Sequence, residues 1–206
     1  MDRRERKKQQ TREALMQAAL ELFDAKGYEQ TTIREIADAV DVATRTFFRY
    51  FASKEELVVS LGADFAESFL EEVRARPVDE VPFAVLSNSF MAVMRAYRED
   101  AAANNAASIY LKVVTLIEET PPLLAAYLRN IHDQQLVIAR VLAEREGIDA
   151  EKDLRPQLAA AIHLGLVGNA VKRALAKEDA GIDDILDEFD ASLGQLDSSL
   201  SGHWSS

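Results

Sequence analysis

Residues 27–57 read GYEQTTIREIADAVDVATRTFFRYFASKEEL and constrain the structure more than any other part of the chain. Two segments in this stretch, Thr32–Glu35 and Ser53–Glu56, match a capping box, in which a hydroxyl and a carboxylate satisfy main-chain amides at a helix start. Helices are therefore expected to begin near residues 33 and 54. Between them, the helical spacing of apolar residues breaks at Asp41, a residue type that tolerates left-handed backbone, which predicts a turn over residues 40–43.

A second short helix is predicted over residues 44–50. The neighbour rule for helices places Phe47 on one side together with Tyr50 and Phe51, and it places four residues on the other. That outward set consists of Thr44, Arg45, Phe48 and Arg49. A short helix, a tight turn and a second helix with hydroxyl and guanidinium groups on its free face form a helix-turn-helix, whose second helix fits the major groove of DNA.

The same stretch resembles the signature of the TetR family of bacterial transcriptional regulators. The resemblance rests on Gly27 and Tyr28, a Thr-Thr-Ile start, an Ile-Ala pair, a Val and the Tyr-Phe-x-Ser-Lys-Glu-x-Leu tail. Four positions depart from the family pattern: Asp41 replaces a turn glycine, Ala43 a capping Ser or Thr, Arg45 a glycine and Phe48 a tyrosine. Phe48 cannot offer a phenolic hydroxyl to a phosphate. Arg45, which stands where the family often has a glycine, becomes the leading candidate for reading a base.

The rest of the chain is predicted to be helical. Apolar periodicity and the positions of Gly and Pro indicate helices over residues 11–25, 53–74, 82–100, 104–118, 122–146, 153–178 and 182–198. The expected fold is all-α with about nine helices, which also matches the architecture of the family. We expect a DNA-binding domain over residues 1–56, a regulatory and dimerisation domain over 57–198 and a disordered tail over 199–206.

Charge is distributed unevenly along the chain. The net charge is -11, yet residues 1–56 hold 11 basic and 11 acidic residues, and the acidic excess lies entirely beyond them. The first twelve residues carry a local charge of +4, which could follow phosphates or enter a minor groove. The acidic excess in residues 57–206 either limits nonspecific binding of the protein to DNA or only keeps the protein soluble.

Several classes of protein are disfavoured. The chain has no cysteine and three histidines, and it lacks a zinc-protease motif, a Gly-rich phosphate loop and a nucleophile elbow, so we expect no enzyme, no metal site and no cofactor. The longest mostly apolar stretch, residues 158–171, is too short to span a membrane. A soluble cytoplasmic protein without a membrane partner is the expectation.

Seven residues are candidate DNA contacts. Arginine can bridge O6 and N7 of guanine, and threonine can touch a thymine methyl group, so Arg45 and Thr46 are assigned to bases. The family resemblance assigns Tyr50 and Lys54 to phosphates. The full set is Thr32, Thr44, Arg45, Thr46, Phe48, Tyr50 and Lys54.

Three of these residues keep a second interpretation. Thr32 could bring helix-terminal amides to a phosphate or serve only as a cap, and Thr44 could serve only to begin its helix. Phe48 could press against a sugar or a thymine methyl, or it could fill a gap beneath the helix.

The resemblance also implies a ligand cavity in the C-terminal domain, with an effector that remains to be identified. Apolar side chains with a few polar tips are candidates for its lining, and ordinary core packing is the alternative for each. They are Phe65, Phe69, Phe90, Met94, Tyr97, Tyr110, Tyr127, His132 and His163. Such a lining fits a hydrophobic effector, either aromatic or acyl.

Two C-terminal helices carry features of a protein interface. Small residues on the penultimate helix permit close helix approach, and the last helix has an apolar stripe; the candidates are Gly165, Gly168, Asn169, Ile182, Ile185, Leu186, Phe189 and Leu193. Packing of these stripes inside one protomer is the alternative. The resemblance implies a homodimer through these helices, and a two-fold dimer suits a near-palindromic operator in double-stranded DNA.

A ligand-responsive repressor is therefore the function that the resemblance favours. The alternative is a helical protein-binding module that has lost its DNA or ligand function. The basic N-terminus and the outward-facing Arg45 and Thr46 argue against that alternative.

Overall fold

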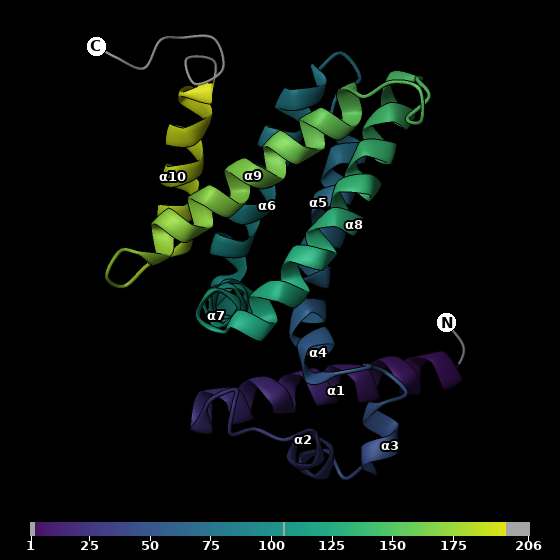
Figure 1. Cartoon of the computed structure of the whole chain (residues 1–206), viewed down its shortest axis with the longest axis vertical. Helices are drawn as coiled ribbons and strands as arrows, with labels where there is room; N and C mark the ends of the chain where they lie inside the picture. The colour runs from purple at the N-terminus through teal and green to yellow at the C-terminus, as the bar shows by residue number, and fades with distance from the viewer. Residues whose placement is uncertain (1–2, 105, 197–206) are drawn as a thin grey trace. The chain divides into compact units, whose positions relative to one another are not determined.

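The computed structural model describes residues 3–104 and 106–196. Within these residues the chain is helical and contains no strand, as expected from the sequence (Figure 1). It divides into two compact units, one ending at Gly62 and the other beginning at Ala63. The expected boundary after residue 56 falls inside a helix. The tail 199–206, predicted to be disordered, lies outside the described residues.

The N-terminal unit contains four helices: α1 (Arg3–Lys26), α2 (Ile33–Ala39), α3 (Thr44–Phe47) and α4 (Lys54–Leu61). Helix α1 packs on α2 and α4, and α2 packs on α3 (Figure 1). Leu15, Phe23, Ile36, Phe47 and Leu57 are buried together with smaller apolar residues in this unit. Burial of their side chains from every helix of the unit supplies most of the stability that such short helices lack on their own.

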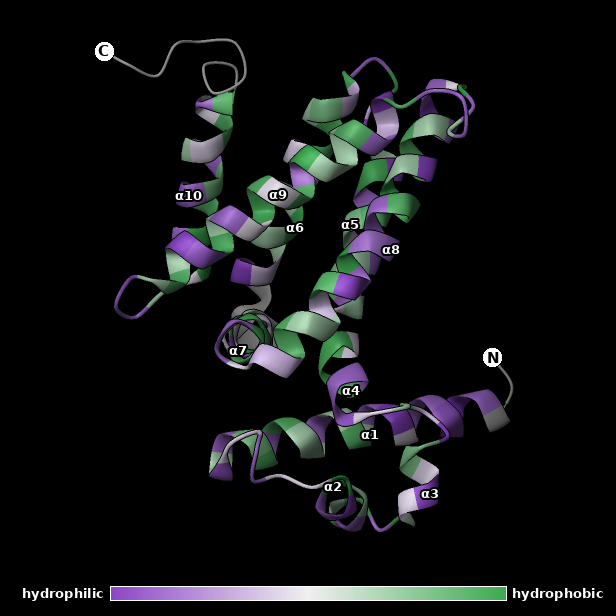
Figure 2. Ribbon diagram, viewed as in Figure 1, coloured by the Kyte–Doolittle hydropathy of each residue, from purple (hydrophilic) through white to green (hydrophobic). Residues whose placement is uncertain are grey.

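Helix α1 begins eight residues before the predicted start. Hydrophilic residues dominate its first turns (Figure 2), and the basic residues there belong to a helix instead of an extended arm. A helix with side chains is about 10–12 Å wide, whereas the minor groove is about 6 Å wide. The helix itself is therefore too wide for the minor groove, which it could reach only with individual side chains.

The predicted starts of α2 and α4 are confirmed. The Glu35 amide donates to Thr32 Oγ1 at 3.2 Å, and the Glu35 carboxylate accepts from the Thr32 amide at 2.9 Å, which completes the capping box. At α4 the Glu56 amide donates to Ser53 Oγ at 3.1 Å, but the Glu56 carboxylate accepts from Ala52 instead of Ser53. Helix α4 is thus capped by the Ser53 hydroxyl, and the Glu56 carboxylate binds the amide of the residue before Ser53.

Two left-handed residues end helices in this unit. Gly27 has φ 84°, and its amide donates to Phe23 O at 2.8 Å, so the chain leaves α1 in the conformation that glycine adopts without a Cβ clash. Asp41 has φ 53° and lies in the turn between α2 and α3. The turn predicted at residues 40–43 is present, and its left-handed residue is the aspartate that stands where the family pattern has glycine.

The C-terminal unit contains six helices in its described residues: α5 (Ala63–Ala75), α6 (Pro82–Asn104), α7 (Ala106–Glu119), α8 (Pro121–Glu146), α9 (Arg155–Leu175) and α10 (Ile182–Gly194). Helix α6 packs against α5, α7, α9 and α10, and α8 packs against α5, α7 and α9 (Figure 1). The helix predicted over residues 53–74 is in fact two, α4 and α5, which are separated at Gly62. This break explains why ten helices are described where about nine were expected.

The far end of α5 is held by an arginine from α8. Nη1 of Arg145 donates to Arg76 O at 2.9 Å, and Nη2 donates to Pro77 O. These carbonyls follow the last turn of α5, where main-chain acceptors lack helical partners. Arg145 therefore satisfies them from a neighbouring helix. None of the helices in the described part of the chain is both long and apolar enough to cross a membrane.

Candidate functional site

Helix α3 and the turn that follows it form a short surface with Arg45, Thr46, Phe48, Arg49 and Tyr50, called the reading surface from here on. Phe47 and Phe51, which share the inward side of the predicted helix, are buried at 0% and 2% exposure, and their rings lie 5.5 Å apart. Because these two residues pack into the core, the side chains on the opposite side of the helix face outward, namely those of Arg45, Phe48 and Arg49. The helix itself covers only Thr44–Phe47 and continues as a turn, so it is shorter than the predicted 44–50.

Arg45 has the properties of a base-reading side chain. It is exposed, and no residue in the described part of the chain forms an ion pair or a hydrogen bond with its guanidinium. Thr44 and Thr46 flank it and are partly buried. Arg45 is therefore free to place its donor fork on a guanine edge.

Phe48 is 54% exposed and meets Phe47 edge-on, with ring centroids 5.6 Å apart. It does not fill a gap beneath the helix, and of the two interpretations only the outward one fits this exposure. A large apolar ring on a reading surface suits contact with a sugar or a thymine methyl.

Tyr50 is positioned by its neighbour. Arg49 donates from Nη2 to Tyr50 Oη at 3.1 Å, and its guanidinium lies 5.0 Å from the ring centroid. The pair places one guanidinium and one phenol on the edge of the reading surface. Arg49 was recognised as outward-facing but was missed as a candidate contact, although it lies four residues after Arg45 on the same side of the predicted helix.

Thr32 is occupied by its own helix cap. Its hydroxyl accepts from the Glu35 amide and also donates to the Glu35 carboxylate at 2.7 Å, and its amide donates to the same carboxylate. Hydrogen bonding from Lys26, and next from Thr32, lowers the pKa of Glu35 to about 2. This carboxylate already fills the anion position at the start of α2, so the cap interpretation of Thr32 accounts for all its contacts.

Lys54 is used inside the N-terminal unit. Its Nζ donates to Tyr28 O at 2.7 Å and to Thr31 O at 2.8 Å, and it lies 3.8 Å from the centroid of the Tyr28 ring. Tyr28 Oη in turn donates to the Glu55 carboxylate at 2.8 Å. Burial lowers the pKa of Lys54 and raises that of Tyr28. These contacts tie the first turn of α4 to the segment before α2, so two of the three ammonium donors are not available to a phosphate.

Aromatic residues converge in the C-terminal unit. Phe65 lies 6.0 Å from Phe90, 5.5 Å from Tyr97 and 5.1 Å from Tyr110, between ring centroids. Met94 is buried in the same core. Burial raises the pKa of Tyr97, Tyr110 and Tyr127.

His163 lies at the centre of a second ring cluster. Its imidazole is 2% exposed and stacks on Phe69 at 5.2 Å, with Phe90 and Phe189 meeting it edge-on at 6.0 and 5.9 Å. Burial lowers the pKa of His163 to about 4, so the ring is neutral at pH 7. His132, which was also predicted as an effector contact, is exposed on α8 and lies outside both ring clusters.

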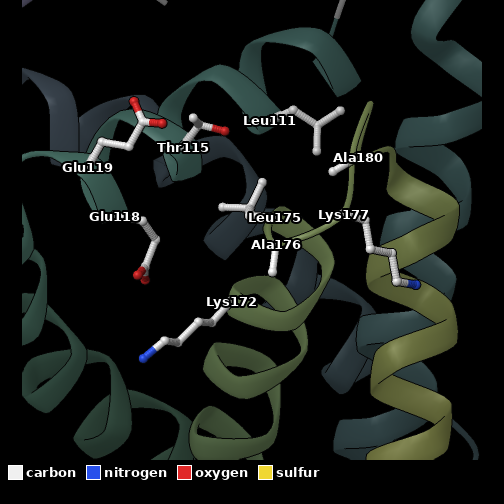
Figure 3. Close-up of a pocket in the computed structure, with 9 residues that line it drawn as sticks. All are labelled: Leu111, Thr115, Glu118, Glu119, Lys172, Leu175, Ala176, Lys177 and Ala180. Carbon is white, nitrogen blue, oxygen red and sulfur yellow. The ribbon is translucent and has the colours of Figure 1, made fainter.

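A surface pocket of about 400 Å³ lies between α7, the end of α9 and the segment that follows it (Figure 3). Leu111 and Leu175 line it and also pack against the hydrophobic core, while Glu118 and Lys172 approach it from opposite helices. None of its lining residues was predicted as a ligand contact. Nothing in the sequence marks them, because the pocket arises from the packing of α7 on α9.

The apolar stripe of α10 faces the core of its own protomer. Ile182, Ile185, Leu186 and Phe189 are between 0% and 6% exposed, and Leu193 packs on the same cluster. Their assignment to a dimer interface is therefore corrected: they are core residues, and the alternative interpretation holds for them. Gly165, Gly168 and Asn169 of α9 are exposed, and Asn169 donates from Nδ2 to Ser192 Oγ at 3.3 Å.

Lys54→Met is expected to lower the free energy of unfolding of the N-terminal unit by about 2 kcal/mol, because two carbonyls lose a charged donor. Urea denaturation followed by circular dichroism measures this change. Lys8→Met, on the exposed face of α1, is the matched control and should leave stability unchanged. A variant at residue 54 with normal stability and weakened DNA binding would instead restore Lys54 as a phosphate contact.

The stability of the protein should depend on pH through His163. Its pKa is about 4 in the folded chain and 6.5 in the unfolded chain, so the unfolded state binds the extra proton as pH falls through this window. Lowering pH from 7 to 5 should therefore reduce the free energy of unfolding by about 2 kcal/mol more in the wild type than in His163→Phe. Urea titrations at the two pH values give this difference, and an equal loss in both proteins would contradict it.

Two family models match the chain. The model described as bacterial regulatory proteins, tetR family, matches residues 15–61, which include the whole of α2 and α3. The model described as the MftR C-terminal domain matches residues 80–197. Together they account for both units.

Individual proteins are similar over different spans. The HTH-type transcriptional regulator TcmR of Streptomyces glaucescens is 38% identical over 98% of this chain and 89% of its own length. The HTH-type transcriptional repressor KstR of Mycobacterium tuberculosis is 35% identical over 37% of this chain and 35% of its own length. Among solved structures, the TetR-family transcriptional repressor FadR of Thermus thermophilus, in complex with lauroyl-CoA, superposes with a TM-score of 0.55 at 24% identity, covering 94% of this chain and 97% of that one.

These relatives are transcriptional regulators, and the family to which they belong acts by binding DNA and not as enzymes. The helix-turn-helix, the all-α fold and the two matching family models agree with one another. This chain therefore belongs to the TetR family of bacterial transcriptional regulators.

Proposed function

We propose that this protein is a ligand-responsive repressor that binds a near-palindromic operator as a homodimer and is released by a small hydrophobic effector. The observation that carries the DNA-binding part is the unpaired, exposed Arg45 on a helix fixed from below by Phe47 and Phe51. The repressor KstR, which is similar over 37% of this chain, supports the direction of regulation.

In this proposal each side chain on the reading surface has a separate task. Arg45 and Thr46 read base edges, Phe48 meets a sugar or a thymine methyl, and Tyr50 with Arg49 contacts a phosphate. The basic first turns of α1 add phosphate contacts, each of which releases a counterion and steepens the salt dependence of binding. Lys54 stabilises the N-terminal unit and makes no primary contact.

The homodimer is proposed to form through the exposed face of α9. Five exposed residues form one line along the helix, because they are spaced alternately by three and four residues. They are Leu158, Ala161, Gly165, Gly168 and Lys172. A Cβ placed on either glycine would meet nothing within 4 Å in the protomer. A partner helix can approach closely along this line, and a two-fold pair of reading helices about 34 Å apart would match successive major grooves.

The effector is proposed to act in the C-terminal unit. Seven of the nine residues expected to contact it belong to the ring clusters or to the core around them. To release DNA, an effector must bind the state with low DNA affinity more tightly, and a coupling of about 1–3 kcal/mol changes operator affinity roughly 5- to 150-fold.

Arg45→Ala is expected to relax the preference at one base position in each half-site. Selection of bound duplexes from a random DNA pool, carried out with the wild type and the variant, measures the preference, and the loss should be about 1–3 kcal/mol at that position. Arg34→Ala, an exposed arginine on α2, is the control, and its preference should match that of the wild type. An unchanged preference in Arg45→Ala would remove Arg45 from the reading role.

The same selection tests the proposed function as a whole. A near-palindrome among the selected sequences supports both the reader and its two-fold symmetry. Affinity for random duplex that does not change with salt would argue against any role in DNA binding.

Ala161→Glu is expected to shift the protein from dimer toward monomer, because a two-fold axis along α9 would bring two carboxylates together in a desolvated contact. Sedimentation velocity across a range of protein concentrations should show dissociation at concentrations at least about tenfold higher than for the wild type. Ala125→Glu, which adds the same charge to an exposed position of α8, is the matched control. Equal dissociation constants for the two variants would exclude this face of α9.

A further inference from the structure

The surface pocket between α7 and α9 has no role in the proposed function. Its volume of about 400 Å³ lies within the range of small-molecule sites. Leu111 of α7 and Leu175 of α9 line the pocket and also pack against the hydrophobic core, which holds both side chains in place (Figure 3). None of the lining residues belongs to the ring clusters. A small apolar group can therefore contact these leucines without displacing a packed ring.

The charged groups that line the pocket are unequally paired. Lys177 Nζ lies 3.1 Å from a carboxylate oxygen of Asp184 and 3.1 Å from one of Glu188, so its charge is already offset. Three other charged side chains line the pocket without an ion pair or a hydrogen bond to any residue in the described part of the chain, and they are Glu118, Glu119 and Lys172. Two carboxylates and one ammonium group thus remain for a ligand, with negative charge in excess.

Two further features of the surroundings favour a cation. Glu118 and Glu119 are the last two residues of α7, and the C-terminal end of a helix carries a partial negative charge from carbonyls without helical partners. The acidic excess of the chain also lies entirely in residues 57–206, so the wider field around the pocket is negative. Lys172 opposes these contributions, but it is a single exposed side chain on the opposite helix.

An organic ammonium fits these groups better than a metal ion does. Calcium and magnesium take six or more oxygen ligands, and transition metals favour histidine or cysteine. Among the residues that the structure describes, no group of three or more His, Cys, Asp or Glu could hold such an ion. An ammonium group has only three donors, which the two carboxylates and the Thr115 hydroxyl on the same side of the pocket can accept together with water.

We propose that this pocket binds an organic cation with a primary ammonium on a compact apolar body. The ammonium would lie at the end of α7, near the carboxylates of Glu118 and Glu119, and the apolar body would contact Leu111 and Leu175. This surface site is separate from the ring clusters, and its ligand is not the effector proposed for them. The inference does not depend on the DNA-binding function.

Four small probes, used with the full chain, separate the charge of the ligand from its apolar body. Benzylamine has both, benzyl alcohol has the ring without the charge, benzoate has the opposite charge, and methylamine has the ammonium without the ring. We expect benzylamine to bind about two- to fivefold more tightly than benzyl alcohol, which is the range of one exposed ion pair. High salt should abolish this difference, and benzoate and methylamine should bind more weakly than benzylamine.

Methyl NMR titrations give both the affinity and the location of each probe. Benzylamine should shift the methyl resonances of Leu111 and Leu175 and leave that of Met94, which is buried in the core, unchanged. A shift confined to Met94 would place the probe in the core and overturn the proposal. It would also be overturned if neither leucine shifted at about 10 mM benzylamine, where a site with a Kd of about 1 mM is nearly saturated.

Variants on α7 test the carboxylates. The double variant Glu118→Gln with Glu119→Gln keeps the size of both side chains and removes their charges, so it should bind benzylamine and benzyl alcohol equally. Glu144→Gln makes the same change at an exposed position of α8 and should keep the wild-type preference. Lys172→Met removes the like charge and should raise the affinity for benzylamine about twofold.

Three results would contradict the assignment of the ammonium to these carboxylates. They are equal affinity of the wild type for benzylamine and benzyl alcohol, tighter binding of benzoate, and a preference for benzylamine that survives in the double variant. Should the double variant fail to fold, the salt dependence in the wild type decides the question, because a preference that persists at high salt does not come from an exposed ion pair.

Discussion

The position of α3 depends on the burial of Phe47 and Phe51, because a helix of four residues cannot form on its own hydrogen bonds. The two rings fix the direction of every outward side chain on this element, including that of Arg45. Two further features restrict α3. The turn with the left-handed Asp41 precedes it, and Lys54, which follows it in the chain, donates hydrogen bonds to Tyr28 O and Thr31 O. A reader of DNA needs such rigidity, since a bidentate contact with a base is lost when its donors shift by about 1 Å.

The C-terminal unit follows a different principle, in which rings from α5, α6, α9 and α10 meet around an unpaired imidazole. Aliphatic side chains could pack the same volume without leaving any polar atom unsatisfied. The core therefore gives up some stability at this position. No charged residue whose burial is described lies in this core, so the imidazole is in a medium of low polarity.

Much of the fold could be predicted from the sequence, because caps, glycine positions and apolar spacing are local signals. Thr32, Ser53 and Gly27 mark helix ends where the structure has them. Periodicity, however, shows that a helix has an apolar face without showing what covers it. It left both alternatives open for the stripe of α10, and the family resemblance assigned the stripe to a partner although it faces its own core. For the same reason the sequence did not distinguish the exposed His132 from the buried His163, or reveal the carbonyl partners of Lys54 and the pocket between α7 and α9.

The open space around Gly165 and Gly168 has a consequence for how this protein varies in evolution. Glycine within a helix costs about 1 kcal/mol relative to alanine, and neither position is crowded in the single chain. Folding of one protomer would therefore favour drift toward alanine or larger residues. Persistence of small residues at these positions among descendants of this sequence would record selection on assembly, whereas free variation would show that the exposed face of α9 has no partner.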